Sequence, residues 1–278
     1  FSINFINCLK LAVKHSLGFC INLETIKEYI FVSPFFIMNK LGNIISIQSQ
    51  PLLLTLFIGP EATSVYMIIR RAAEIMLHLM RVIHASIMGT FAHFFSGSDK
   101  SKSAEIAEII LNVSIIFGVI GFSNYVAMNN IFISLWIDED LIINKNLSIV
   151  IAVSFFATAM RGILGQMLYG IGDFKVPSVI ALTEGLLAAF MSIVLINFFG
   201  AIGAAASLLL SSVIAVVVIG LRLNEKLSLQ LKTNDFFKLI LSTILLFILS
   251  FLVSLQNVKI DAWSLFFLAL FVLSIIFS

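Results

Sequence analysis

Charged residues are scarce in this sequence. Asp, Glu, Lys and Arg make up 12% of its 278 residues, whereas 60% of the residues are hydrophobic. Soluble domains have about 25% charged and about 45–50% apolar residues. The composition therefore excludes a soluble domain of useful size and predicts a polytopic membrane protein. A net charge of +2, with no clustering of the basic residues, also argues against a nucleic-acid partner.

Features of catalysis and of metal binding are absent as well. The only cysteines, Cys8 and Cys20, lie in a basic N-terminal stretch expected in the cytosol, and no metal-ligand spacing surrounds them. The chain contains no G-x-S-x-G, no H-E-x-x-H and no glycine-rich phosphate loop. We therefore expect that the protein is not an enzyme and that it holds neither a metal nor a cofactor.

Long apolar stretches are what the sequence has in abundance. A helix needs about 20 apolar residues to cross a hydrocarbon layer about 30 Å thick. Such stretches occupy residues 30–57, 61–95, 104–126, 147–171, 176–198, 201–222, 239–257 and 262–278. They predict an all-α membrane bundle of about eight transmembrane helices, preceded by a mixed linking segment at residues 1–29. The chain begins with Phe1 and its last apolar run stops at Ser278 without a cap, so we expect a fragment open at both ends.

The distribution of Lys and Arg predicts the orientation, because cytosolic connections are enriched in these residues. One set of connections carries ten of them and the opposite set carries only Lys145 and Lys259. The N-terminal segment and the loop at residues 223–238 are therefore expected in the cytosol. The longest outer connection is expected at residues 127–146.

Two features of the connections and spans bear on helix packing. Very short connections at Gly59-Pro60 and Phe199-Gly200 predict antiparallel helical hairpins. Pro34 and Pro51 fall inside the first span, where each removes a backbone donor and favours a bend. Either a kinked helix that wraps the bundle or a flexing gate helix fits this pattern. The run of small residues from Gly200 to Ser207 predicts close helix packing.

The second span, Glu61 to Phe95, carries charges that an ordinary membrane helix lacks. Glu74, His78, Arg81 and His84 lie within about 80° of Arg70 on a helical wheel, and Arg71 lies on the edge of that face. Arg70, Arg71 and Glu74 are expected near the middle of the bilayer, where a charge costs about 2.5–3.5 kcal/mol unless it meets water or a partner. Arg81 is expected to extend toward the cytosolic interface.

Lys40 in the first span is expected at a similar depth. Lys40, Arg70 and Arg71 would then meet one carboxylate, that of Glu74. A buried ion pair is one interpretation, but it leaves two cations without a partner. The other is a wet cavity that binds an anionic substrate through Lys40, Arg70 and Arg71, since the planar fork of arginine suits phosphate.

Three further residues have two interpretations each. His78 stands one turn after Glu74 and could relay protons, or it could be a hydrogen-bonding residue of the core. Arg161 and Glu184 lie at similar depths on adjacent spans, which predicts either a structural ion pair or a gate on the cytosolic side. His78 and His84 face different directions, so we expect no metal site.

Three stretches resemble the C-terminal half of bacterial polysaccharide flippases in the multidrug/oligosaccharidyl-lipid/polysaccharide exporter superfamily. These stretches are FIGPEATSVYMIIRRAAEIM (57–76), GQMLYGIGDFKVPSVIALTEGLLAAF (165–190) and INFFGAIGAAASLLLSSVI (196–214). The resemblance implies that residues 30–222 form one six-helix lobe of a two-lobed transporter. Residues 239–278 would form two additional C-terminal helices, truncated by the end of the chain.

The resemblance also implies a function. Such a protein would move an undecaprenyl-pyrophosphate-linked oligosaccharide across the bacterial inner membrane by alternating access. Its partners would be that lipid-linked oligosaccharide, membrane lipids and the N-terminal lobe of the same protein. A cation-coupled multidrug exporter of the same superfamily is an alternative, although it would need a more acidic cavity. A polysaccharide polymerase or ligase would need a longer outer loop.

Overall fold

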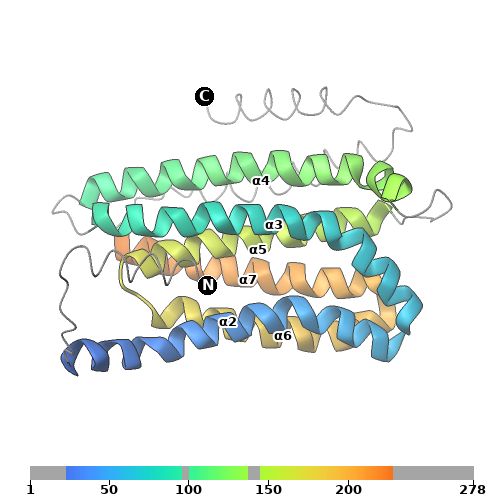
Figure 1. The fold of residues 1–278 in the computed structure, drawn as a ribbon, viewed down its shortest axis with the longest axis horizontal. Helices are drawn as coiled ribbons and strands as arrows, with labels where there is room; N and C mark the ends of the chain where they lie inside the picture. The colour runs from blue at the N-terminus through green and yellow to red at the C-terminus, as the bar shows by residue number, and fades with distance from the viewer. Residues whose placement is uncertain (1–22, 96–99, 137–144, 228–278) are drawn as a thin grey trace, which may run out of the picture.

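The computed structural model describes residues 23–95, 100–136 and 145–227, and every element in these ranges is an α-helix (Figure 1). The helices are α2 (Leu23–Phe57), α3 (Pro60–Phe95), α4 (Lys100–Trp136), α5 (Lys145–Gly170), α6 (Lys175–Phe199) and α7 (Ala201–Leu227). All six are long and apolar enough to cross a membrane. This part of the chain thus has the composition and helix lengths of a multi-pass membrane protein, and the six spans predicted between residues 30 and 222 are confirmed as helices. The spans predicted at 239–257 and 262–278 lie outside the described residues, so a total of eight is not confirmed.

Some predicted boundaries are wrong by several residues. Helix α2 begins at Leu23, so the end of the predicted linking segment is helical, and α7 continues to Leu227. Helix α4 extends to Trp136, although an outer loop was predicted from residue 127. This stretch contains the polar residue Asn129, which is buried inside the bundle. Its side-chain amide lies 3.3 Å from both the Ile69 carbonyl on α3 and Ser148 Oγ on α5.

The helices run alternately up and down, side by side, as Figure 1 shows. Helix α2 packs along α6, α6 also packs along α7, and α7 packs along α5. Helices α3 and α4 cover the other side of α5, which makes α5 the most deeply buried of the elements described here. The predicted hairpin of α6 and α7 is a packed pair. Helices α2 and α3, by contrast, touch little beyond their turn.

The turns that connect these hairpins depend on glycine. Gly59 between α2 and α3 has a φ of 122°, and Gly200 between α6 and α7 has a φ of 59°. Residues with a Cβ atom rarely adopt such angles. Ile58 and Gly59 separate α2 from α3, and Gly200 alone separates α6 from α7, so each hairpin reverses direction over one or two residues.

Helices α2 and α6 approach each other most closely at two glycines. A Cβ atom on Gly42 would overlap the main-chain carbonyl of Ala181, and one on Gly185 would overlap the carbonyl of Gly42. Between α6 and α7, a Cβ atom on Gly203 would likewise overlap the carbonyl of Leu195, as expected for the run of small residues. In lipid, packing of this kind replaces the hydrophobic driving force between helices.

Gly185→Ala is therefore expected to lower the stability of the protein. The new methyl group has no space at the α2–α6 crossing, and overpacking typically costs about 1–3 kcal/mol. Thermal unfolding in detergent, followed by size-exclusion chromatography of the heated samples, measures the change. Gly89→Ala is the matched control, since a Cβ atom there meets nothing within 4 Å. A loss of the same size in both variants would contradict the packing argument.

Candidate functional site

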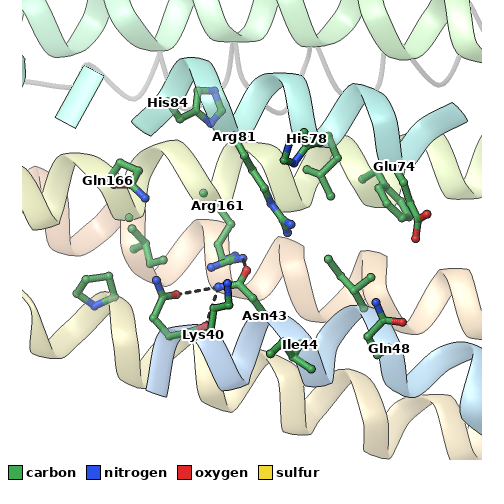
Figure 2. A pocket seen from close by; sticks show the side chains of 18 of the residues that line it. Lys40, Asn43, Ile44, Gln48, Glu74, His78, Arg81, His84, Arg161 and Gln166 are labelled. Carbon is green, nitrogen blue, oxygen red and sulfur yellow. Dashed lines mark hydrogen bonds between the residues drawn. The ribbon is translucent and has the colours of Figure 1, made fainter. Parts of the chain in front are cut away.

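A cavity of about 780 Å³ opens where α2 and α3 diverge. Side chains of α2 form one wall, those of α3 the opposite wall, and those of α5 the back (Figure 2). Besides apolar side chains, its wall includes the polar residues Asn39, Lys40, Asn43, Gln48, Arg71, Glu74, His78, Arg81, His84, Arg161, Gln166 and Tyr169. Helix α5 is thus the rigid, buried element against which the two diverging helices hold the cavity open.

The cavity wall carries a surplus of positive charge. Among the described residues, four basic side chains line it, those of Lys40, Arg71, Arg81 and Arg161, against the single carboxylate of Glu74, and Arg161 is also paired with Glu184 behind the wall. Figure 2 shows Arg81 extending from α3 into the space between the helices, with Lys40 on the α2 side. Within the low dielectric of a helix bundle, such a surplus attracts anions strongly.

Arg70 lies outside this set, which corrects the sequence prediction that it binds substrate. Its side chain is completely buried between α2 and α3 and is absent from the cavity wall. Its Nε and Nη2 atoms donate to Glu74 Oε1 at 2.9 and 2.5 Å, and its Cζ atom lies 5.5 Å from the centre of the Tyr66 ring. Arg70 is therefore neutralised by its own carboxylate and has no free donor face for a ligand.

Glu74 is shared between two arginines. Its second oxygen accepts a hydrogen bond of 3.2 Å from Arg71 Nη1. The Arg71 side chain is 59% exposed, so this bond is weak and the guanidinium remains accessible in the cavity. Of the predicted substrate-binding residues, the structure thus brings Arg71 and Lys40 to the cavity.

Lys40 and Arg81 are the cations without a carboxylate of their own. Within the described part of the chain, neither forms a hydrogen bond or an ion pair, and both side chains are exposed. Arg81 was expected to extend toward the membrane interface, but its side chain lines the cavity between α2 and α3. The prediction that Lys40 lies at the same depth as Arg70 is also wrong. Arg70 contacts Ile47, which is two turns further along α2 than Lys40.

Arg161 and Glu184 form the ion pair considered from the sequence. Arg161 Nε lies 2.8 Å from Glu184 Oε2, with both side chains almost fully buried. The angle at this contact does not suit a hydrogen bond, so charge attraction accounts for it. The second Glu184 oxygen accepts a 2.6 Å bond from Ser212 Oγ on α7, and Arg161 Nη2 donates to Asn43 Oδ1 on α2 at 2.5 Å. The pair therefore joins four helices at the back of the cavity.

His78 does not form the hydrogen bond with Glu74 on which the suggested proton relay would depend. Its side chain is exposed in the cavity wall. His84 is buried, and its Nδ1 atom has no hydrogen-bond partner in the part of the chain described here. In that same part, no group of three His, Cys, Asp or Glu side chains could hold a metal ion.

Several polar residues of the site, among them Asn43 and Gln166, were not assigned a role from the sequence. Asn43 orients Arg161, and Gln166 on α5 adds an amide to the cavity wall. The only sequence feature that pointed to Asn43 was its position about one helical turn after Lys40. The position of Gln166 in the cavity wall could not be predicted, because the sequence does not indicate which face of α5 borders the cavity.

The fold and the site together define a class, that of multi-pass helical membrane proteins with a cationic cavity inside the bundle. Comparison of the chain with protein-family models, with curated proteins and with solved structures found no match. The function is therefore inferred from the residues of the cavity.

Proposed function

We propose that this chain is one lobe of a transporter that carries a lipid-linked oligosaccharide with a pyrophosphate group across the bacterial inner membrane. The observation that carries the proposal is the unpaired positive charge of Lys40 and Arg81, within the described part of the chain, in a cavity among membrane-spanning helices. A charge in such a place is costly unless water or an anion compensates it. A pyrophosphate between the two side chains would supply that compensation.

Arg71 completes the proposed binding surface. Its exposed guanidinium can present two parallel N–H donors to phosphate oxygens once it releases the weak bond to Glu74. The amides of Gln48 and Gln166 line the same cavity and can donate to further oxygens. In this scheme the lipid tail of the substrate stays in the bilayer, and the N-terminal lobe of the protein closes the cavity on its other side.

The cationic wall also weighs against the competing functions. A cation-coupled exporter would need acidic groups for its cargo and its coupling ion. Among the described residues, however, Glu74 is the only carboxylate in the cavity wall, and two arginines already contact it. A polymerase or ligase would need a nucleophile in contact with a general base, and the cavity-lining residues that the structure describes include no such pair joined by a hydrogen bond.

Lys40→Gln and Arg81→Gln are each expected to lower transport by about ten- to a hundredfold, since each removes one charge-assisted contact worth about 1.5–3 kcal/mol. The measurement is translocation of a fluorescent undecaprenyl-pyrophosphate-linked sugar by the full-length protein in proteoliposomes. Lys40→Arg keeps the charge and should keep most of the activity. Lys175→Gln, which removes an exposed charge at the start of α6, is the control. Unchanged transport by the double variant K40Q/R81Q would refute the proposal.

A further inference from the structure

Pro51 leaves a gap in the hydrogen bonding of α2. In an uninterrupted α-helix, the N–H of residue 51 would donate to the carbonyl of Ile47. Proline has no N–H, yet α2 continues as a helix to Phe57. Ile47 is only 9% exposed and lies at the edge of the cavity, in the outer half of a span that runs from Tyr29 to Phe57. Its carbonyl therefore lacks the donor that α2 would otherwise supply, and leaving a buried carbonyl without a donor is costly.

Arg70 provides a donor instead. Its Nη1 atom donates to the Ile47 carbonyl across the α2–α3 contact at 3.2 Å. The remaining donors face Glu74, and the guanidinium packs on the ring of Tyr66. The side chain is completely buried, so these contacts leave it little freedom. Its position is set by its own helix, and only its outer nitrogen crosses to α2.

A second cross-helix bond supports the same segment of α2. Tyr66 Oη donates to Gln50 Oε1 at 2.6 Å, and Gln50 Nε2 donates to the Ser46 carbonyl at 3.1 Å. The carbonyls one turn before Pro51 are thus bonded to side chains on both α2 and α3. The other proline of α2, Pro34, differs because the carbonyl left free there is that of Ile30, a residue that is 67% exposed near the end of the span.

We propose that Arg70 is a positioning residue that replaces the missing N–H of Pro51 and so fastens α2 to α3 at the outer end of the cavity. Beyond this contact the two helices diverge, so it sets where the cavity begins. Arg70 also holds Glu74, and through it Arg71, in the cavity wall. The inference does not rest on the proposed substrate, because all of its contacts are within the protein.

A double-mutant cycle between Arg70 and Pro51 tests this assignment. Arg70→Met in the full-length protein should lower the midpoint of thermal unfolding by about 5 °C. Pro51→Ala restores an N–H to residue 51, so the same Arg70→Met change in that background should lower the midpoint by clearly less. Arg71→Met is the control, since it removes a Glu74 partner without touching Ile47. Its effect should be the same in the wild-type protein and in the Pro51→Ala background.

Hydrogen exchange gives a second readout at the contact itself. Arg70→Met should raise amide exchange at residues 48–55 when residue 51 is proline, and much less when it is alanine. Equal losses of stability and equal exchange in both backgrounds would overturn the proposal. If R70M alone yields no folded protein, recovery of folded protein in R70M/P51A supports the assignment, and failure of both variants to fold overturns it.

Discussion

Glu184→Leu is expected to destabilise the protein by about 3–5 kcal/mol, because it leaves the buried charge of Arg161 without its partner. Arg161 and Glu184 are 5% and 3% exposed, and their contacts join α2, α5, α6 and α7. Without Glu184, the Arg161 guanidinium could move away from its buried position only by breaking its hydrogen bond to Asn43 on α2. Denaturation in detergent, with unfolding measured as a function of temperature and of denaturant, gives the loss.

Replacing both partners is expected to be far less harmful than replacing one. Two apolar side chains of similar volume need neither desolvation nor pairing, so R161M/E184L should recover most of the stability lost by E184L. Arg222→Gln is the control, because Arg222 pairs with Asp173 and Glu225 with its side chain 37% exposed, and a pair of this kind contributes about 0–1 kcal/mol. A single variant as stable as the wild type, or a double variant no better than the single ones, would contradict the assignment.

The folded double variant also decides between the two roles of the pair that the sequence left open. If the pair is only structural, R161M/E184L should transport at close to the wild-type rate. If it is a gate on the cytosolic side, the variant should fold but lose its coupling between binding and translocation, which single-turnover measurements in proteoliposomes would detect. Stability and transport are thus read from the same preparation.

The helices could be predicted from the sequence because each of the six is a long apolar run bounded by charged or turn-forming residues. Their ends were less predictable where a polar residue is buried by tertiary contacts. Asn129 illustrates this, since its amide is bonded to α3 and α5 and so lets α4 continue to Trp136. No local pattern distinguishes such an asparagine from one that begins a loop.

The site was only partly predictable, because a helical wheel gives the face of a side chain but not what covers that face. Arg70 and Arg81 share one face of α3. Near the turn α2 covers that face and buries Arg70, whereas about 16 Å further along α3 the cavity has opened and Arg81 lines it. The similar depth of Arg161 and Glu184 in their predicted spans correctly predicted that they form an ion pair. They do so even though α5 and α6 make few contacts with each other.

His78→Cys is expected to react with a water-soluble thiol reagent at least about a hundredfold faster than Leu79→Cys, because only a hydrated thiol ionises to the reactive thiolate. The two positions are adjacent on α3 and both are exposed on the lobe, but only His78 lines the cavity. Arg81→Cys and Val82→Cys form a second pair matched in depth. Cys8 and Cys20 are first replaced by serine, and labelling is measured in proteoliposomes by mass spectrometry.

The charge of the reagent extends the test from water to electrostatics. A negatively charged methanethiosulfonate should modify His78→Cys faster than a positively charged one of similar size, because Lys40 and Arg81 raise the local concentration of anions. Lys40→Gln should reduce this preference, and Lys175→Gln should leave it unchanged. Equal rates at residues 78 and 79 would mean that this face of α3 meets lipid or protein rather than water. If residue 78 reacts faster than residue 79 but shows no preference for the anionic reagent, the cavity contains water but its basic side chains do not select an anionic ligand.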